Sequence, residues 1–152
     1  MTQISNLPAH KARNLIGQKK LSSTELVKSC IEQYEKHNRN INAIVAIDQK
    51  DVLEQAKKCD VKVSKGETLG LLHGLPVGIK DLQMVKNLRS TYGSLLFKNY
   101  IPKHDDNIVN NIREEGGIVF CKTNTPEFGA GANTKNRVYG ATGNPFQYDL
   151  TS

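Results

Sequence analysis

One segment constrains the fold more than any other: residues 72–81, which place a lysine directly behind a short apolar strand. Gly74 and Pro76 mark a turn at the entry, and the pattern of Val77–Ile79 is typical of a β-strand that leads into Lys80. We therefore expect Lys80 to be delivered by a buried strand and to be desolvated. Desolvation disfavours the charged form of a lysine, which can make the amine a base near neutral pH.

The patterns on either side of this segment alternate between helix and strand, which is typical of an α/β fold. Ser22 and Glu25 form a capping box, and the apolar spacing behind them predicts a helix that ends near residues 37–38. Asp105 or Asp106 begins another helix, with Ile108, Val109 and Ile112 facing inward. The other expected elements are a strand over 43–47, a helix from 51 through 59, a polar connector over 61–69, a helix stop at 116–117, a strand over 118–121, and loops beyond 123.

Composition narrows the classes of protein that this chain can be. The net charge of +6 comes from scattered lysines and arginines without interleaved aromatic residues, which favours a solvated basic surface over a nucleic-acid site. Apolar runs are too short for a membrane span, and no signal-sequence pattern begins the chain. The three cysteines lack CxxC or metal-ligand spacing, so we expect buried reduced thiols, no metal site and a cytoplasmic location.

Seven short motifs, taken together, resemble the amidase signature family, the amide hydrolases with a Ser-cisSer-Lys triad. They occur in the family's order and at its spacing from about residue 20 to the C-terminus. The motifs are Leu21–Val27, Ile41–Ala43, His73–Asp81, Thr91–Ser94, Gly117–Val119, Lys122–Phe128 and Tyr139–Pro145. The resemblance implies an α/β fold with a mixed sheet flanked by helices, and an activity without metal or organic cofactor.

Lys80 matches the base of the family's relay, which takes the nucleophile's proton through a cis-serine. Without the resemblance, a lone strand-end lysine is more often a surface residue. The spacing of Gly74, Gly78 and Lys80 does not fit a phosphate-binding Walker A loop. An ion pair between Lys80 and Asp81 is disfavoured because adjacent strand residues point to opposite faces.

A second candidate site is the small-residue loop at Gly129, Ala130 and Gly131, whose backbone can approach a substrate closely. The resemblance places this loop along the acyl pocket, while a plain turn-rich connector is an equal alternative. The resemblance also implies that Lys122, Asn124 and Glu127 are scaffold residues. His73 is expected to be structural, because no Asp-His-Ser order surrounds it.

Both catalytic serines of the family belong to a glycine/serine-rich signature that would follow residue 152. We therefore expect residues 1–152 to be the N-terminal part of one amidase domain, truncated before that signature. The parent reaction is hydrolysis of a carboxamide C–N bond through an acyl-serine, and we expect this chain to be inactive alone. A small-molecule amide is the expected substrate if a complementing C-terminal fragment completes the site, with neither nucleic acid nor membrane as a partner.

Three other interpretations compete with this one. The chain can be a non-catalytic remnant, or the front part of a tRNA-dependent amidotransferase A subunit with partner subunits and tRNA. Within the family, Thr125–Phe128 looks more like the free-standing amidases than that amidotransferase. A small basic binding module is the least favoured interpretation, and salt-sensitive binding of nucleic acid would be its signature.

Overall fold

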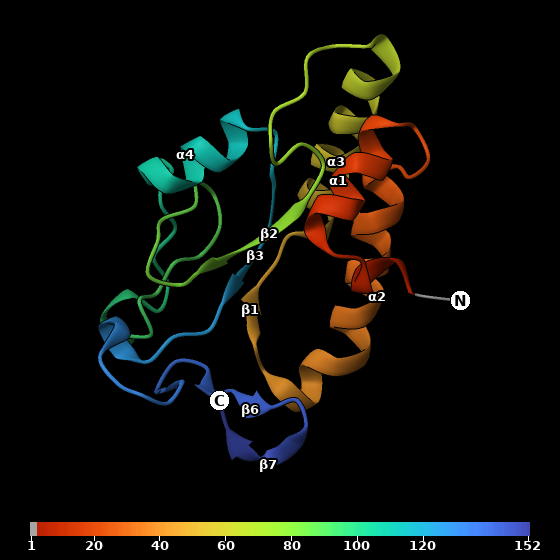
Figure 1. Ribbon diagram of the computed structural model, residues 1–152. Coiled ribbons are helices and arrows are strands. Elements are labelled where there is room, and N and C mark those ends of the chain that lie inside the picture. The colour runs from red at the N-terminus through yellow and green to blue at the C-terminus, as the bar shows by residue number, and fades with distance from the viewer. Residues whose placement is uncertain (1–2) are drawn as a thin grey trace.

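The computed structural model describes residues 3–152, and its main elements are four α-helices and a three-stranded sheet (Figure 1). The helices are α1 (Ala9–Gly17), α2 (Ser23–Ile41), α3 (Gln49–Lys65) and α4 (Asn107–Glu114). The strands of the sheet are β1 (Ile44–Ala46), β2 (Pro76–Lys80) and β3 (Ile118–Thr123). No described helix is long and apolar enough to cross a membrane.

The sheet has the order β1-β3-β2 and is mixed, which confirms the predicted α/β class with a mixed sheet. Strand β2 runs parallel to β3, whereas β1 is antiparallel to β3. The β2–β3 register shifts between Val77, which pairs with Val119, and Gly78, which pairs with Cys121. Phe120 therefore has no partner in β2 and forms a bulge. Each β3 residue after Phe120 points to the face of the sheet opposite to the one it would occupy in a regular strand.

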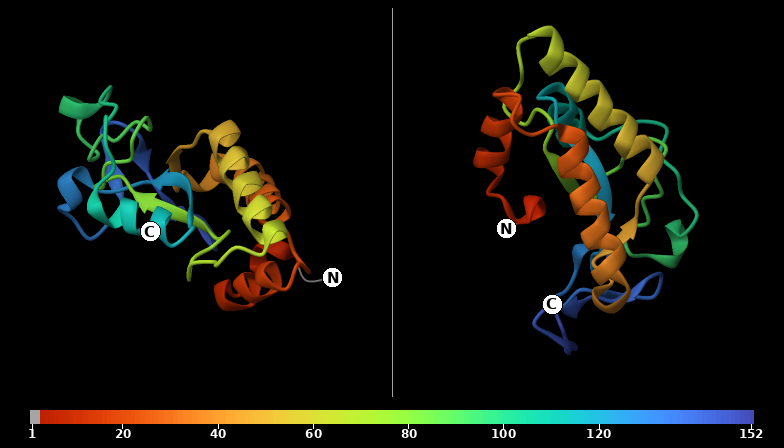
Figure 2. Two further views of the ribbon diagram at one scale, coloured as in Figure 1. Left: turned by 90° about the horizontal axis from the view of Figure 1, so that it is seen from above. Right: turned by 90° about the vertical axis from the view of Figure 1, so that its right-hand side faces the viewer.

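Helices cover the sheet on both faces, with α1, α2 and α3 on one side and α4 on the other (Figure 2). Val27 of α2 and Ala56 of α3 are fully buried against Ile118 and Phe120 of β3 in one apolar cluster. On the other face, Val109 of α4 packs with Ile79, Val85 and Val119. Because Ile118 and Val119 face opposite layers, β3 is the central strand of the core.

The helix boundaries confirm some predictions and correct others. The capping box at Ser22 and Glu25 is present, and α2 extends to Ile41 before Asn42 takes a left-handed conformation. Helix α3 begins earlier than predicted because Asp48 caps it, and it continues to Lys65, so a polar connector over 61–65 is wrong. Helix α4 follows Asp106 as predicted, but its Ile108 side chain is 55% exposed rather than inward.

The first helix, α1, is an element that the sequence patterns did not predict. Ala12 and Ile16 are its buried residues, and they pack with Leu21, Leu26 and Leu75. Beyond residue 123 the chain is rich in loops as predicted, but it also forms two pairs of short strands that the sequence patterns did not predict. These pairs are β4 (Lys135–Asn136) with β5 (Gly140–Ala141), and β6 (Gly143–Asn144) with β7 (Gln147–Thr151).

Candidate active site

Lys80 is the last residue of β2, and its side chain is exposed. The predicted burial of this lysine is therefore wrong. Strand β2 is an edge strand with one neighbour, so half of its surroundings are open. Ile79 and Asp81 on either side of Lys80 are buried, at 4% and 0% exposure, which turns Lys80 to the opposite face.

The buried lysine at this end of the sheet is Lys122 in β3, which is 0% exposed. Its Nζ lies 3.1 Å from Oδ1 of Asp81, and both side chains of this ion pair are fully buried. The same ammonium donates to Oγ of Ser90 at 2.7 Å and to the backbone carbonyl of Gln83. The pairing confirms that Asp81 does not hold Lys80, and it gives Lys122 the scaffold role expected of it.

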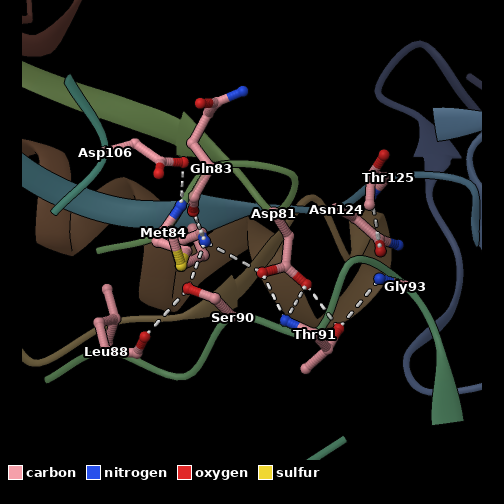
Figure 3. A network of polar contacts seen from close by, with 11 residues as sticks. Asp81, Gln83, Met84, Leu88, Ser90, Thr91, Gly93, Asp106, Asn124 and Thr125 are labelled. Carbon is pink, nitrogen blue, oxygen red and sulfur yellow. Dashed lines mark hydrogen bonds and ion pairs between the residues drawn. The ribbon is translucent and has the colours of Figure 1, made fainter. Parts of the chain in front are cut away.

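Asp81 also closes the segment between residues 81 and 91 into a loop (Figure 3). The carboxylate accepts hydrogen bonds from the Thr91 amide at 3.0 Å and from the Thr91 hydroxyl at 2.6 Å. Thr91 Oγ1 in turn accepts from the Gly93 amide at 3.1 Å. The chain directly after Lys80 is thus fixed by a network that does not include the Lys80 side chain among the residues described.

The ionisation of Lys122 reflects two opposing effects. Desolvation by burial lowers the pKa of Lys122 below its usual value, and the charge and hydrogen bond of Asp81 act in the opposite direction. Burial is the larger of the two effects, so the pKa of Lys122 is lowered overall. An ammonium in this position is stable because three oxygen acceptors replace its hydration.

Two aromatic residues next to this network have left-handed backbones. Tyr92 has φ 55° and Phe128 has φ 51°, and the Phe128 amide donates to the Tyr92 carbonyl at 2.8 Å. Such conformations are rare for bulky residues and persist only where surrounding contacts enforce them. The Phe97 ring lies between the two, with ring centroids 5.2 Å from Tyr92 and 6.3 Å from Phe128.

The candidate substrate loop, Gly129–Gly131, is exposed and begins where the short 3₁₀ turn Glu127–Gly129 ends. A Cβ on Gly129 would lie 2.9 Å from Cδ1 of Leu82, two residues after Lys80. Its φ of +74° also disfavours a side chain. The fold therefore brings this loop and Lys80 to the same end of the sheet, at the C-terminal ends of β2 and β3. Substrate binding by the loop stays a prediction.

Asn124 connects the end of β3 to the C-terminal hairpins. Its Nδ2 donates to Thr142 Oγ1 at 2.9 Å, and its Oδ1 accepts from Asn136 Nδ2 at 2.7 Å. Asn136 also donates to the Thr125 carbonyl at 2.8 Å. Asn136 is a structural residue that the sequence patterns did not single out, because only the folded chain brings residues 124 and 136 together.

The remaining candidates lie away from this edge. His73 is 2% exposed, and its Nε2 lies 3.1 Å from the Cys59 carbonyl, as a structural histidine would. Cys59 and Cys121 are buried thiols and Cys30 is half-buried; burial raises the pKa of Cys121 to about 12. Among residues 3–152, no cluster of three or more histidine, cysteine or acidic side chains is placed to hold a metal ion.

The fold is that of solved amide-hydrolase structures. A bacterial aryl acylamidase of the amidase signature family superposes with a TM-score of 0.88 at 27% identity, covering 95% of this chain and 30% of that chain. A fatty acid amide hydrolase superposes with a TM-score of 0.87 at 24% identity, covering 97% of this chain and 27% of that chain. The second likeness shows the fold alone.

Sequence comparisons give the same assignment. The profile described as Amidase matches residues 25–152. The A subunit of the glutamyl-tRNA(Gln) amidotransferase from Clostridium botulinum (strain Eklund 17B / Type B) is 37% identical over 145 residues, covering 95% of this chain. The chain therefore belongs to the Amidase family, and it spans about 30% of the length of the curated relatives that it matches.

Proposed function

We propose that this chain is the lysine-bearing part of an enzyme that hydrolyses a carboxamide C–N bond through an acyl-serine intermediate. The observation that carries the proposal is the position of Lys80 at the end of β2, next to a buried network that leaves its amine free. Lys80 would take the proton that leaves the nucleophilic serine, as the base in a Ser-Lys variant of a catalytic triad. Gly129, Ala130 and Gly131 would line the acyl group of the substrate.

We further propose that residues 1–152 alone do not hydrolyse amides. No side-chain hydrogen bond joins Lys80 to a serine hydroxyl among the residues that the structure describes. The relay therefore requires a further segment that covers the exposed Lys80 and supplies both serines. A reducing cytoplasmic location and the absence of a nucleic-acid partner stay predictions.

The experiment compares the amidase activity of the chain alone with its activity when a second chain supplies the missing serines. The 152-residue chain is assayed with p-nitroacetanilide, alone and after co-expression with the serine-bearing remainder of an amidase relative. We expect hydrolysis only in the complex, and we expect Lys80→Ala to lower kcat/KM by at least about a hundredfold. Lys86→Ala, which removes a nearby exposed lysine, is the matched control and should leave the activity unchanged.

Two outcomes would contradict the proposal. Serine-dependent hydrolysis by the isolated chain would show that the site is complete within 152 residues. Equal activity of the Lys80→Ala complex and the unaltered complex would remove Lys80 from the reaction.

A second candidate function is supported by the 37% identity to an amidotransferase A subunit. In that case the amide cleaved would be that of glutamine, and the ammonia would pass to partner subunits. Release of ammonia from glutamine by the complemented protein, with no hydrolysis of the anilide, would favour this function over a free-standing amidase.

A further inference from the structure

A small cavity lined by basic residues lies at the opposite end of the sheet from Lys80, near the N-terminal ends of β2 and β3. Its volume is about 200 Å³, and its lining includes Lys58 and Lys62 of α3, Arg113 of α4, and His73 and Gly116 from the loops that precede the two strands. One water occupies about 30 Å³ of liquid, so the cavity has room for a small anion with several waters.

The lysines of this cavity have no carboxylate partner. Among the side chains that the structure describes, the ion pairs are Lys122–Asp81 and Arg113–Asp105. Lys58 and Lys62 are one helical turn apart, and like charges at this spacing repel each other. An anion held between them would relieve that repulsion.

Three acidic groups near the cavity accept hydrogen bonds from backbone amides. Asp60 accepts hydrogen bonds from the Ser23 and Thr24 amides at the start of α2, at 2.7 and 3.1 Å. Glu115 accepts from the Leu71 amide at 2.7 Å, and Asp105 accepts from the Lys86 amide at 2.6 Å. These carboxylates keep their negative charge but are held by backbone amides, and among the described residues none forms an ion pair with Lys58 or Lys62.

Arg113 brings a third cation to the cavity in a fixed orientation. Its Nε donates to Asp105 at 2.8 Å and its Nη1 donates to Gln55 Oε1 at 3.0 Å. A guanidinium carries five N–H donors, so donors remain for a further ligand. Proteins commonly hold phosphate oxygens with a planar, oriented guanidinium and with lysine ammonium groups, and this cavity offers both, since Lys58 and Lys62 are exposed.

We propose that this cavity binds a phosphate group, either inorganic phosphate or the monoester of a small metabolite, through Lys58, Lys62 and Arg113. The site lies away from Lys80 and is independent of the proposed amide chemistry. The lining also includes the apolar residues Ile118 and Cys59, and the stems of lysines can cover apolar surface while their ammonium groups stay in water.

His73 provides an internal probe for the bound charge. Its pKa is lowered, first by burial and then by the positive charges of Arg13 and Lys62, while the Cys59 carbonyl and Asp60 act in the opposite direction. A phosphate beside Lys62 would favour the protonated imidazole, so the pKa of His73 should rise when phosphate binds. A ligand elsewhere on the surface would leave it unchanged.

The test is a titration of the full 152-residue chain with inorganic phosphate and, separately, with AMP, at constant ionic strength kept with chloride. We expect saturable binding by calorimetry, together with an upward shift of the His73 titration by NMR. Lys58→Gln and Lys62→Gln should each weaken binding about tenfold. Lys57→Gln is the matched control, because Lys57 is an exposed neighbour on α3 that does not line the cavity.

Saturation by either ligand supports the site, and the ratio of the two affinities distinguishes free phosphate from a monoester. The proposal is overturned if phosphate acts no differently from chloride, or if Lys57→Gln weakens binding as much as Lys58→Gln. Binding of RNA through these lysines without saturable binding of inorganic phosphate or AMP would also overturn it.

Discussion

Two lysines lie at the ends of neighbouring strands, Lys80 as the last residue of β2 and Lys122 as the next-to-last residue of β3, and their surroundings in the fold are opposite. Lys122 of β3 pairs in register with Ile79 of β2, one residue before Lys80. Lys122 is fully buried, with a carboxylate, a hydroxyl and a carbonyl as partners, whereas Lys80 is exposed. The difference lies in the surroundings, because both residues follow apolar strand residues in the sequence.

This contrast shows what decides the burial of a lysine at a strand end. The partners of Lys122 come from residues 81–90, which loop back over the end of β3. The bulge at Phe120 in β3 turns Lys122 to the α4 face, where those partners lie. Lys80 is on the edge strand and faces the other way, so its amine lies outside that network and is exposed.

The largest expected change in the free energy of unfolding comes from removing the buried ammonium of Lys122. Lys122→Met should lower the free energy of unfolding by about 3–5 kcal/mol, because Asp81 would stay buried without its counter-ion. Urea denaturation followed by circular dichroism measures this loss. The double variant Asp81→Asn/Lys122→Met removes the charge while keeping an acceptor for Thr91, and should be more stable than Lys122→Met alone; the reverse order would contradict the ion-pair explanation.

A smaller loss of unfolding free energy is expected when the Thr91 hydroxyl, which donates a hydrogen bond to Asp81, is removed. Thr91→Val should cost about 1.5–3 kcal/mol, because the carboxylate loses the 2.6 Å hydrogen bond from Thr91 Oγ1. Thr125→Val is a matched control, since Thr125 is equally buried but its hydroxyl has no hydrogen-bond partner among the residues described. Equal losses in the two variants would mean that packing, rather than the hydrogen bond, explains the effect.

The smallest effect is expected at the exposed lysine. Lys80→Met should change the free energy of unfolding by less than about 0.5 kcal/mol, as substitutions away from buried networks do. The same denaturation assay applies. A loss comparable to that of Lys122→Met would show that Lys80 supports the fold and would remove the contrast between the two lysines.

Much of the architecture could be predicted from local patterns. The capping box at Ser22 fixed the start of α2, and the Gly116-Gly117 stop separated α4 from β3. Helix α1 was missed because only Ala12 and Ile16 are buried in it, too few apolar positions for a clear period. The end of α3 was misplaced because Val61 and its polar neighbours are exposed but still helical.

The candidate site was predictable only in part, for a physical reason. The position of Lys80 at a strand end follows from the apolar run before it, but its exposure depends on which strand lies at the edge of the sheet. The partnership of Asp81 with Lys122 joins residues 41 positions apart (122 minus 81) and depends on a bulge that leaves no local signal. Long-range pairing of this kind requires the folded chain.

The most direct test of the contrast is amine labelling of the native chain with a limiting amount of an acetylating reagent, read by peptide mass spectrometry. Lys80 should react at a rate similar to that of exposed Lys86. Lys122 should react at least about a hundredfold more slowly and become equally reactive in urea, because its amine is reached only after local opening. Fast labelling of Lys122 in the native chain, or protection of Lys80, would contradict the account.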